Sequence, residues 1–183
     1  MNLLKDTTAL ALAMCEKYLK ETSVAVDATC GRGNDTLWLA ERCRKVYAFD
    51  IQKEAIDSTR TMLEEAGVAA ELICDSHNKI CDYVSENPDV IVFNLGYLPG
   101  GDKAVTTNGE ETLEALSLSL ELLSVDGLLC VTMYPGHPQG AREQEMILAW
   151  AGELDKGNFH CVFANMLNQP VSAPQILWIT KKK

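Results

Sequence analysis

Two glycines and one aspartate are spaced so that they could hold a nucleotide-like ligand. Gly31 and Gly33 stand in the segment TCGRGNDT, where the backbone must turn tightly and approach a ligand without a Cβ in the way. The amides that open the following helix attract negative groups. Asp50 ends the next apolar run, where an acidic side chain can bind both ribose hydroxyls. A bound pyrophosphate is disfavoured, because the dinucleotide fingerprint wants Gly or Ala where this chain has Thr36.

Polar residues after the second and third apolar runs could recognise an adenosine. Gln52 could reach the ribose or the adenine, or could simply open a helix. Asp75, Ser76 and His77 stand where an adenine ring would lie, although Ser76 equally fits a helix N-cap. For Asp50 the alternative to a ribose contact is to cap the helix that begins near Lys53, but the ribose contact is favoured. His77 could stack on a ring, contact the ribose, carry a proton or be a polar residue of a first helical turn.

The segment NLGY at 94–97 resembles the N-P-P-Y motif of methyltransferases that modify amino groups. Methyl transfer is an in-line displacement at a sulfonium carbon. A nitrogen nucleophile therefore needs its lone pair aimed at that carbon while acceptors hold its remaining hydrogens. The side-chain oxygen of Asn94 and the carbonyl of Leu95 could be those acceptors, and Tyr97 could form an aromatic wall beside the base. The simpler interpretation is a Gly/Pro-rich connection between a strand and a helix.

The loop that begins at NLGY continues through GGDK and is longer than an ordinary connection, which indicates a functional loop such as a substrate lid. Lys103 in this loop, with Arg32 and Arg142, should place positive charge at one edge of the sheet. An RNA partner would require such a patch. His137, in the segment YPGHPQG, is either a substrate contact or a solvated turn residue.

Short apolar runs alternate with helical patterns along the chain, which predicts parallel strands joined by crossover helices. The last two strands are too close in sequence for a crossover helix and should form an antiparallel hairpin. Strands are expected at 24–28, 45–50, 70–74, 89–94, 127–134, 159–165 and 174–180, and helices at about 7–20, 35–41, 53–66, 76–84, 110–123 and 141–154.

The predicted fold is therefore α/β, a mostly parallel seven-stranded sheet with a C-terminal antiparallel hairpin. This is the Rossmann-like class I methyltransferase architecture, whereas a dinucleotide-binding domain ends in a parallel sixth strand. Residues 1–183 are too few for two ordinary domains, so a single domain is expected. Ligands of open parallel sheets bind at the carboxyl ends of the strands, where all the candidate residues above should meet.

Composition limits the partners and the compartment. The formal net charge of −10 opposes non-specific binding to nucleic acid, so an RNA substrate would need a local basic patch. Seven scattered cysteines without a CxxC pair indicate reduced thiols, a cytoplasmic location and no metal site. No apolar stretch is long enough to span a membrane. The apolar run at 9–15 faintly resembles an export signal, but the charged residues after it favour an amphipathic helix.

The segments DATCGRGNDT, DIQ, DSH, NLGYLPGGDK and YPGHPQGAREQE together resemble a known family. It is the group of small methyltransferases labelled rRNA methylases, which includes the MnmM-type (YtqB-like) tRNA methyltransferases, and the resemblance covers nearly the whole chain. It implies S-adenosylmethionine as cofactor and methylation of the 5-aminomethyl group on wobble 2-thiouridine, in the anticodon loop of tRNA. Cofactor contacts are implied for Arg32, Asn34, Asp50, Gln52, Ser76 and His77, with the amine beside Asn94.

The leading hypothesis is methylation of this amine in tRNA. We expect Asn94 and Tyr97 to be catalytic, and Lys103, His137 and Arg142 to bind substrate. The expected cofactor-binding residues are Gly31, Arg32, Gly33, Asn34, Asp35, Asp50, Gln52, Asp75, Ser76 and His77. The amine must lose a proton before attack. His77, His137 or water could accept it, and the sequence does not choose among them.

Other functions stay open at this point. The substrate could be rRNA, a protein or a small amine, or the chain could be a cofactor-binding module without catalysis. A nicotinamide oxidoreductase is disfavoured by Thr36 and by the terminal hairpin. A homodimer is also expected, because a second copy would enlarge the surface with which an acidic protein binds RNA.

Overall fold

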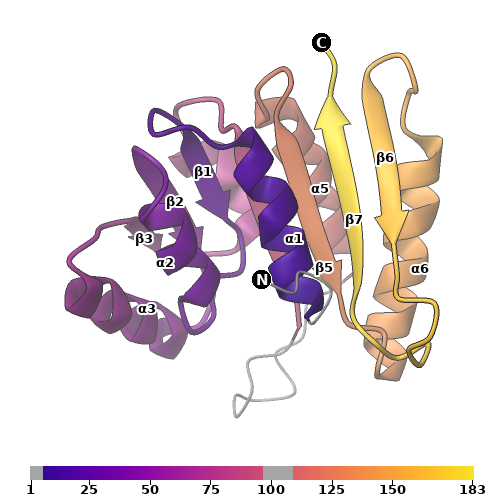
Figure 1. The fold of residues 1–183 in the computed structure, drawn as a ribbon, viewed down its shortest axis with the longest axis horizontal. Helices are drawn as coiled ribbons and strands as arrows, with labels where there is room; N and C mark the ends of the chain where they lie inside the picture. Colours follow the sequence, from indigo (N-terminus) through magenta and orange to yellow (C-terminus); the bar gives the residue numbers. More distant parts are fainter. Residues whose placement is uncertain (1–5, 97–108) are drawn as a thin grey trace.

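A seven-stranded sheet organises the chain, with the strand order β3-β2-β1-β4-β5-β7-β6 (Figure 1). The computed structural model describes residues 6–96 and 109–183. The strands are β1 Val24–Asp27, β2 Lys45–Phe49, β3 Glu71–Ile73, β4 Val90–Leu95, β5 Leu128–Met133, β6 Phe159–Ala164 and β7 Gln175–Lys181. The strand order reverses between β1 and β4, which is the switch point where open α/β sheets bind ligands.

The pairing directions confirm the predicted fold class. The first five strands in the chain pair in parallel, and β7 pairs antiparallel with both β5 and β6. Because β1 ends at Asp27, opposite Val92, the last residues of β4 extend beyond it. Asn94 lies on this extension, opposite Thr132 of β5. The end of β4, with Asn94, is therefore paired with the loop that follows β1 and not with β1 itself.

Helices cover the sheet on two faces. One face carries α1 Thr7–Cys15, α2 Asn34–Ala40 and α3 Lys53–Ala66, and the other carries η3 His77–Lys79, α4 Ile80–Tyr83, α5 Gly109–Leu122 and α6 Pro138–Glu153. In Figure 1, α1 lies in front of the sheet and α5 and α6 lie behind it. None of the described helices is long and apolar enough to cross a membrane.

Helix boundaries differ from the expected ones where local capping decides them. The helix α6 begins three residues earlier than expected, at Pro138, because a proline suits a first helical position and the His137 side chain accepts a hydrogen bond from the Gly140 amide. The helix expected at 7–20 changes to a 3-10 turn, η2 Glu16–Tyr18, and the one expected at 76–84 divides into η3 and α4.

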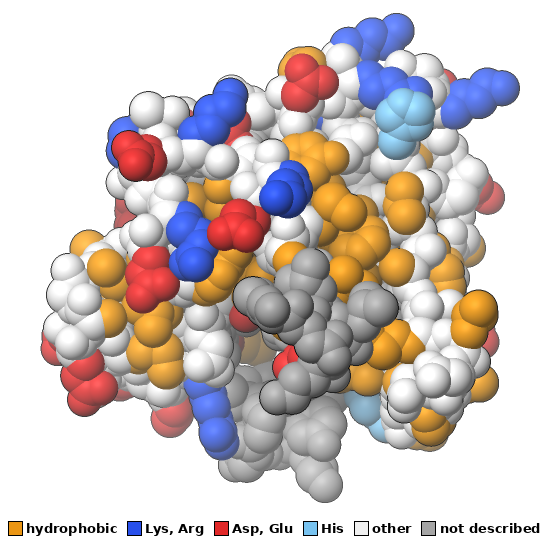
Figure 2. Space-filling view, viewed as in Figure 1, with side chains coloured by type: hydrophobic (Ala, Val, Ile, Leu, Met, Phe, Trp, Pro, Cys, Tyr) orange, Lys and Arg blue, Asp and Glu red, His pale blue; other side chains and the backbone are white. Residues whose placement is uncertain are grey.

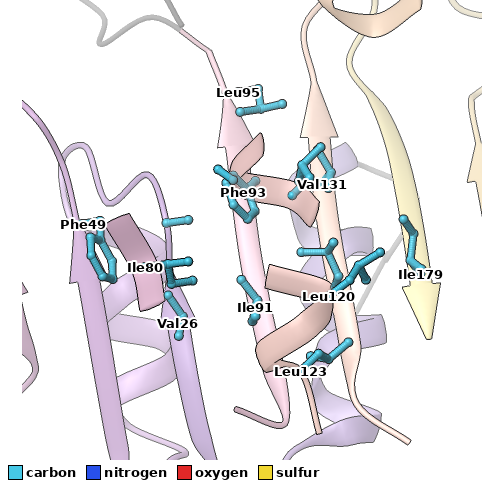
Figure 3. Packing of buried hydrophobic residues seen from close by; sticks show 14 of the residues in the cluster. Val26, Phe49, Ile80, Ile91, Phe93, Leu95, Leu120, Leu123, Val131 and Ile179 are labelled. Carbon is cyan, nitrogen blue, oxygen red and sulfur yellow. The ribbon is translucent and has the colours of Figure 1, made fainter. Parts of the chain in front are cut away.

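The larger core cluster lies between the sheet and the α5/α6 layer. Aliphatic and aromatic side chains from the central strands meet those of the helices there, as Figure 3 shows for Ile91, Phe93 and Val131 against Leu120 and Leu123. Residues such as Ile91 and Val131 are wholly buried. A second cluster packs α1 and α2 against the opposite face, so the central strands are apolar on both sides.

Truncation of this core should destabilise the fold in proportion to burial. We expect Leu129→Ala to lower the free energy of unfolding by about 2–5 kcal/mol, because Leu129 is completely buried and its loss leaves a cavity. The matched control is Leu167→Ala, whose side chain is 95% exposed and should change stability by less than about 0.5 kcal/mol. Urea denaturation measures both, and equal losses would contradict this account of the core.

Candidate active site

A buried carboxylate lies beneath the site. Asp27 is fully buried at the end of β1, and its oxygens accept hydrogen bonds from the Thr36 hydroxyl at 2.6 Å and the Thr29 amide at 3.2 Å. Burial, together with the nearby Asp35 carboxylate, raises the pKa of Asp27 to about 7. The Thr29 hydroxyl in turn accepts a hydrogen bond from the backbone amide of Asn94 at 2.7 Å. One carboxylate thus joins the loop after β1, the start of α2 and the end of β4.

The side chain of Asp50 stabilises the glycine loop after β1 by a hydrogen bond. Gly31 and Gly33 have positive φ angles of 52° and 90°, and the Gly31 amide donates to an Asp50 oxygen at 3.0 Å. The other Asp50 oxygen accepts from the Gln52 amide at 2.9 Å. A Cβ at Gly33 would lie 2.9 Å from the Thr59 Cα, so only glycine fits against α3 there.

Asn94 lies at the centre of the site and is held from three sides. Besides the bond from its backbone to Thr29, its side-chain nitrogen donates to Asp35 Oδ2 at 3.2 Å. The Asn94 side chain and Thr8 of α1 also lie beside the Tyr134 hydroxyl, and both act to lower its pKa, against the raising effect of burial. Burial raises the pKa of Asp35, while its hydrogen bond from Asn94 acts in the opposite direction.

The residues after β3 are anchored by their own hydrogen bonds. Asp75 accepts from Lys79 Nζ at 3.0 Å and from the Tyr83 hydroxyl at 2.9 Å, and these bonds help to lower its pKa to about 2. Ser76 is the N-cap of η3, as the simpler interpretation expected. His77 is buried edge-on against Phe93, and burial lowers its pKa. Their contacts with a cofactor stay a prediction.

The remaining predicted residues lie around Asn94 and the glycine loop. Arg32 and Asn34 are exposed beside Gly33. Arg142 is exposed in the first turns of α6, and His137 is the partly buried N-cap of that helix, in the loop that follows β5. All of them therefore lie at the carboxyl edge, while the predicted Tyr97 and Lys103 lie outside the described residues.

Sequence reasoning missed four residues that the structure brings into the site. Asp27 and Tyr134 were treated as strand residues, Thr8 only as part of the helix expected at 7–20, and Thr29 only as part of the segment TCGRGNDT. The signal for Asp27 was present, because an aspartate inside the apolar run VAVDA must find partners when it is buried. The contacts of Tyr134 and Thr8 join distant parts of the chain, and no local pattern could reveal them.

The donor set fits a nucleoside cofactor that carries positive charge. Each Asp50 oxygen keeps a further lone pair that can accept a ribose hydroxyl. The site also gathers Asp27 and Asp35 beside the glycine cradle, where their negative charge would favour a sulfonium or ammonium group. Within residues 6–96 and 109–183, no group of three His, Cys, Asp or Glu side chains could hold a metal ion.

The raised pKa of Asp27 predicts a pH-dependent stability. Between about pH 4 and pH 7 the folded state keeps a proton that the unfolded state has lost, so the free energy of unfolding should fall across this window as pH rises. The loss is about 4 kcal/mol, since one pKa unit corresponds to about 1.4 kcal/mol and the window spans about three. Asp27→Asn should remove this part of the slope in urea titrations, and an unchanged slope would contradict the assignment.

Comparisons with known proteins agree with this geometry. The family model described as "Putative rRNA methylase" matches residues 46–180. The chloroplastic tRNA (mnm(5)s(2)U34)-methyltransferase of Arabidopsis thaliana is 36% identical over 194 residues, which cover 98% of this chain and 70% of that protein.

Solved structures are similar over almost the whole chain. A "putative rRNA-methylase" from Clostridium thermocellum has a TM-score of 0.94 at 34% identity, and covers 97% of this chain and 98% of its own. A "putative methyltransferase" from Streptococcus mutans, solved with bound S-adenosylhomocysteine (SAH), has a TM-score of 0.90 at 37% identity with the same coverage. The chain belongs to the "Putative rRNA methylase" family, and it is an S-adenosylmethionine-dependent methyltransferase of the tRNA/rRNA-methylase type.

Proposed function

We propose that this methyltransferase N-methylates the primary amine of the 5-aminomethyl group on wobble 2-thiouridine in tRNA. The observation that carries the proposal is the position of Asn94, partly buried on the extension of β4 beside the glycine loop. An amide oxygen there can hold the hydrogens of an attacking amine. The similarity to the Arabidopsis relative, which is named for a wobble-uridine methyltransferase activity, supports the choice of substrate.

The roles of the side chains follow from their positions. S-adenosylmethionine supplies an electrophilic methyl group when it is bound. The Gly31–Gly33 loop and Asp50 would hold its nucleoside, with Gln52, Asp75, Ser76 and His77 toward the adenine. Asn94 Oδ1 would accept a hydrogen bond from the amine, and Tyr97 would form one wall of the substrate pocket. Because burial lowers the pKa of His77, its ring is neutral near pH 7.

The docking of RNA must overcome the negative charge of the protein. Arg32 and Arg142 are both exposed at the carboxyl edge of the sheet. Arg32 precedes Asn94 in the sequence, and Arg142 follows it. With Lys103 they would contact backbone phosphates of the anticodon loop, while the acidic pocket receives only the modified base. We propose that residues 1–183 work as one domain in the cytoplasm, where all seven cysteines stay as the free thiols found in the structure.

The direct test is methyl transfer from labelled S-adenosylmethionine to bulk tRNA from cells that lack this gene, followed by nucleoside mass spectrometry. We expect 5-aminomethyl-2-thiouridine to gain one methyl group. Asn94→Ala should lower kcat about 100-fold while the affinity for SAH stays unchanged, because the lost acceptor holds only the amine.

The other functions give distinct results in the same assay. Label in rRNA, or in a small amine added in place of tRNA, would replace the proposed substrate. Binding of SAH without transfer to any of these acceptors would support a cofactor-binding module. Undiminished turnover by Asn94→Ala would show that Asn94 does not hold the amine.

We also propose that the protein acts as a homodimer. The strand β6 is an edge strand whose side chains are largely exposed, including Val162 at 54%. None of the described helices lies in front of β6 and β7 in Figure 1, and Figure 2 shows hydrophobic side chains gathered between α1 and this edge. An uncovered edge strand with an apolar surface is a pairing site for another chain.

Sedimentation at low protein concentration tests the dimer. We expect a species of twice the 20.1 kDa chain mass, and we expect Val162→Glu to convert it to a monomer because the charge would be buried in the interface. Glu153→Lys on the exposed end of α6 is the control for a change of charge alone. A wild-type monomer at micromolar concentration would contradict the proposal.

A further inference from the structure

The side-chain amide of Asn94 has a defined set of partners in the structure. Its Nδ2 donates to Asp35 Oδ2 at 3.2 Å, and the Tyr134 hydroxyl is a second polar neighbour of the same side chain. The backbone of Asn94 is fixed separately, because its amide donates to the Thr29 hydroxyl at 2.7 Å. Main chain and side chain are therefore held by different groups.

Orientation matters for an amide, because its two ends differ chemically. The nitrogen offers two donors and the oxygen only accepts. An attacking amine has hydrogens to donate, so it needs the amide oxygen of Asn94 as its acceptor. If the Asn94 amide were rotated so that its two ends exchanged places, its N–H donors would face the N–H donors of the amine. A carboxylate such as Asp35 accepts and never donates when ionised, so it selects the nitrogen end and directs Oδ1 the other way.

Both partners are well anchored for this task. Asp35 is partly buried in the first turn of α2, and its neighbour Thr36 is tied to the buried Asp27 by a 2.6 Å hydrogen bond. The Tyr134 ring lies against Gly96, where an added Cβ would be 3.4 Å from it, and its hydroxyl also contacts Thr8 of α1. The position of Asn94 thus depends on α1, α2 and the end of β5.

We propose that Asp35 and Tyr134 are positioning residues, which hold the Asn94 amide with its oxygen toward the substrate amine. This inference rests on the proposed function, in which Asn94 accepts a hydrogen bond from that amine. It gives Asp35 a role in ordering the acceptor, in place of the direct cofactor contact expected from the sequence.

The kinetic test uses variants that separate the hydrogen bond from the charge. Asp35→Ala removes both and should lower kcat on tRNA about 100-fold. Asp35→Asn keeps an acceptor oxygen and should recover activity to within about fivefold of the wild type, and Tyr134→Phe should cost about tenfold because it loses only the hydroxyl. SAH affinity, measured by calorimetry, should change less than about twofold in all three.

A double-mutant cycle tests whether Asp35 acts through Asn94. In the Asn94→Ala background, Asp35→Ala should cause no further loss of kcat, since the residue it positions is absent. A full additional loss would overturn the proposal, because Asp35 would then act independently. A loss of SAH affinity as large as the loss of kcat/KM would also overturn it in favour of a cofactor contact.

A measurement without tRNA keeps this inference separate from the proposed function. The side-chain amide resonances of Asn94 can be assigned by their absence from the spectrum of Asn94→Ala. We expect them to shift in Asp35→Ala and Tyr134→Phe and to stay close to the wild type in Asp35→Asn. Unshifted resonances in Asp35→Ala would overturn the positioning role. If the wild type does not methylate the tRNA, the proposed function fails and this spectrum alone decides the positioning of the amide.

Discussion

The site depends on one buried carboxylate. Asp27 ends β1 without any exposure to solvent, and burying a charge is costly unless it is neutralised or hydrogen-bonded. Its two oxygens meet this requirement by accepting from Thr36 and Thr29, and the same two bonds fix the start of α2 and the loop after β1. Thr29 then holds the backbone of Asn94. The need to satisfy one aspartate therefore sets the relative positions of the cofactor loop and the reacting edge of β4.

The fold could be predicted well from the sequence because the two patterns that indicate it can each be recognised within a short stretch of the chain. Alternation of apolar runs with helical patterns gave all seven strands, and the short connection between residues 165 and 174 predicted the antiparallel hairpin that β6 and β7 form. The helix boundaries were less accurate, since they depend on caps such as His137 and on 3-10 turns that the apolar pattern does not reveal.

The site was predicted only in part, for a physical reason. Gly31, Gly33 and Asp50 lie just after strands and Asn94 lies near the end of one, and the rule that ligands bind at the carboxyl edge found them. Tyr134 follows a strand too, but its contact with Thr8 joins residues more than a hundred positions apart. Contacts of that kind depend on tertiary packing, which residue types and spacing do not specify.

The acidic character of the site suits a cationic cofactor and limits how the proposed anionic substrate can dock. Asp35 and Asp50 both help to raise the pKa of Asp27, so the carboxylates repel one another in the absence of positive charge. A ligand with a sulfonium and an ammonium group relieves that repulsion, and by linkage its binding favours the ionised carboxylates. Phosphates would be repelled from the same place. In the proposed function, a tRNA substrate would therefore insert only its modified base, and its backbone would stay at the rim with exposed cations such as Arg32 and Arg142.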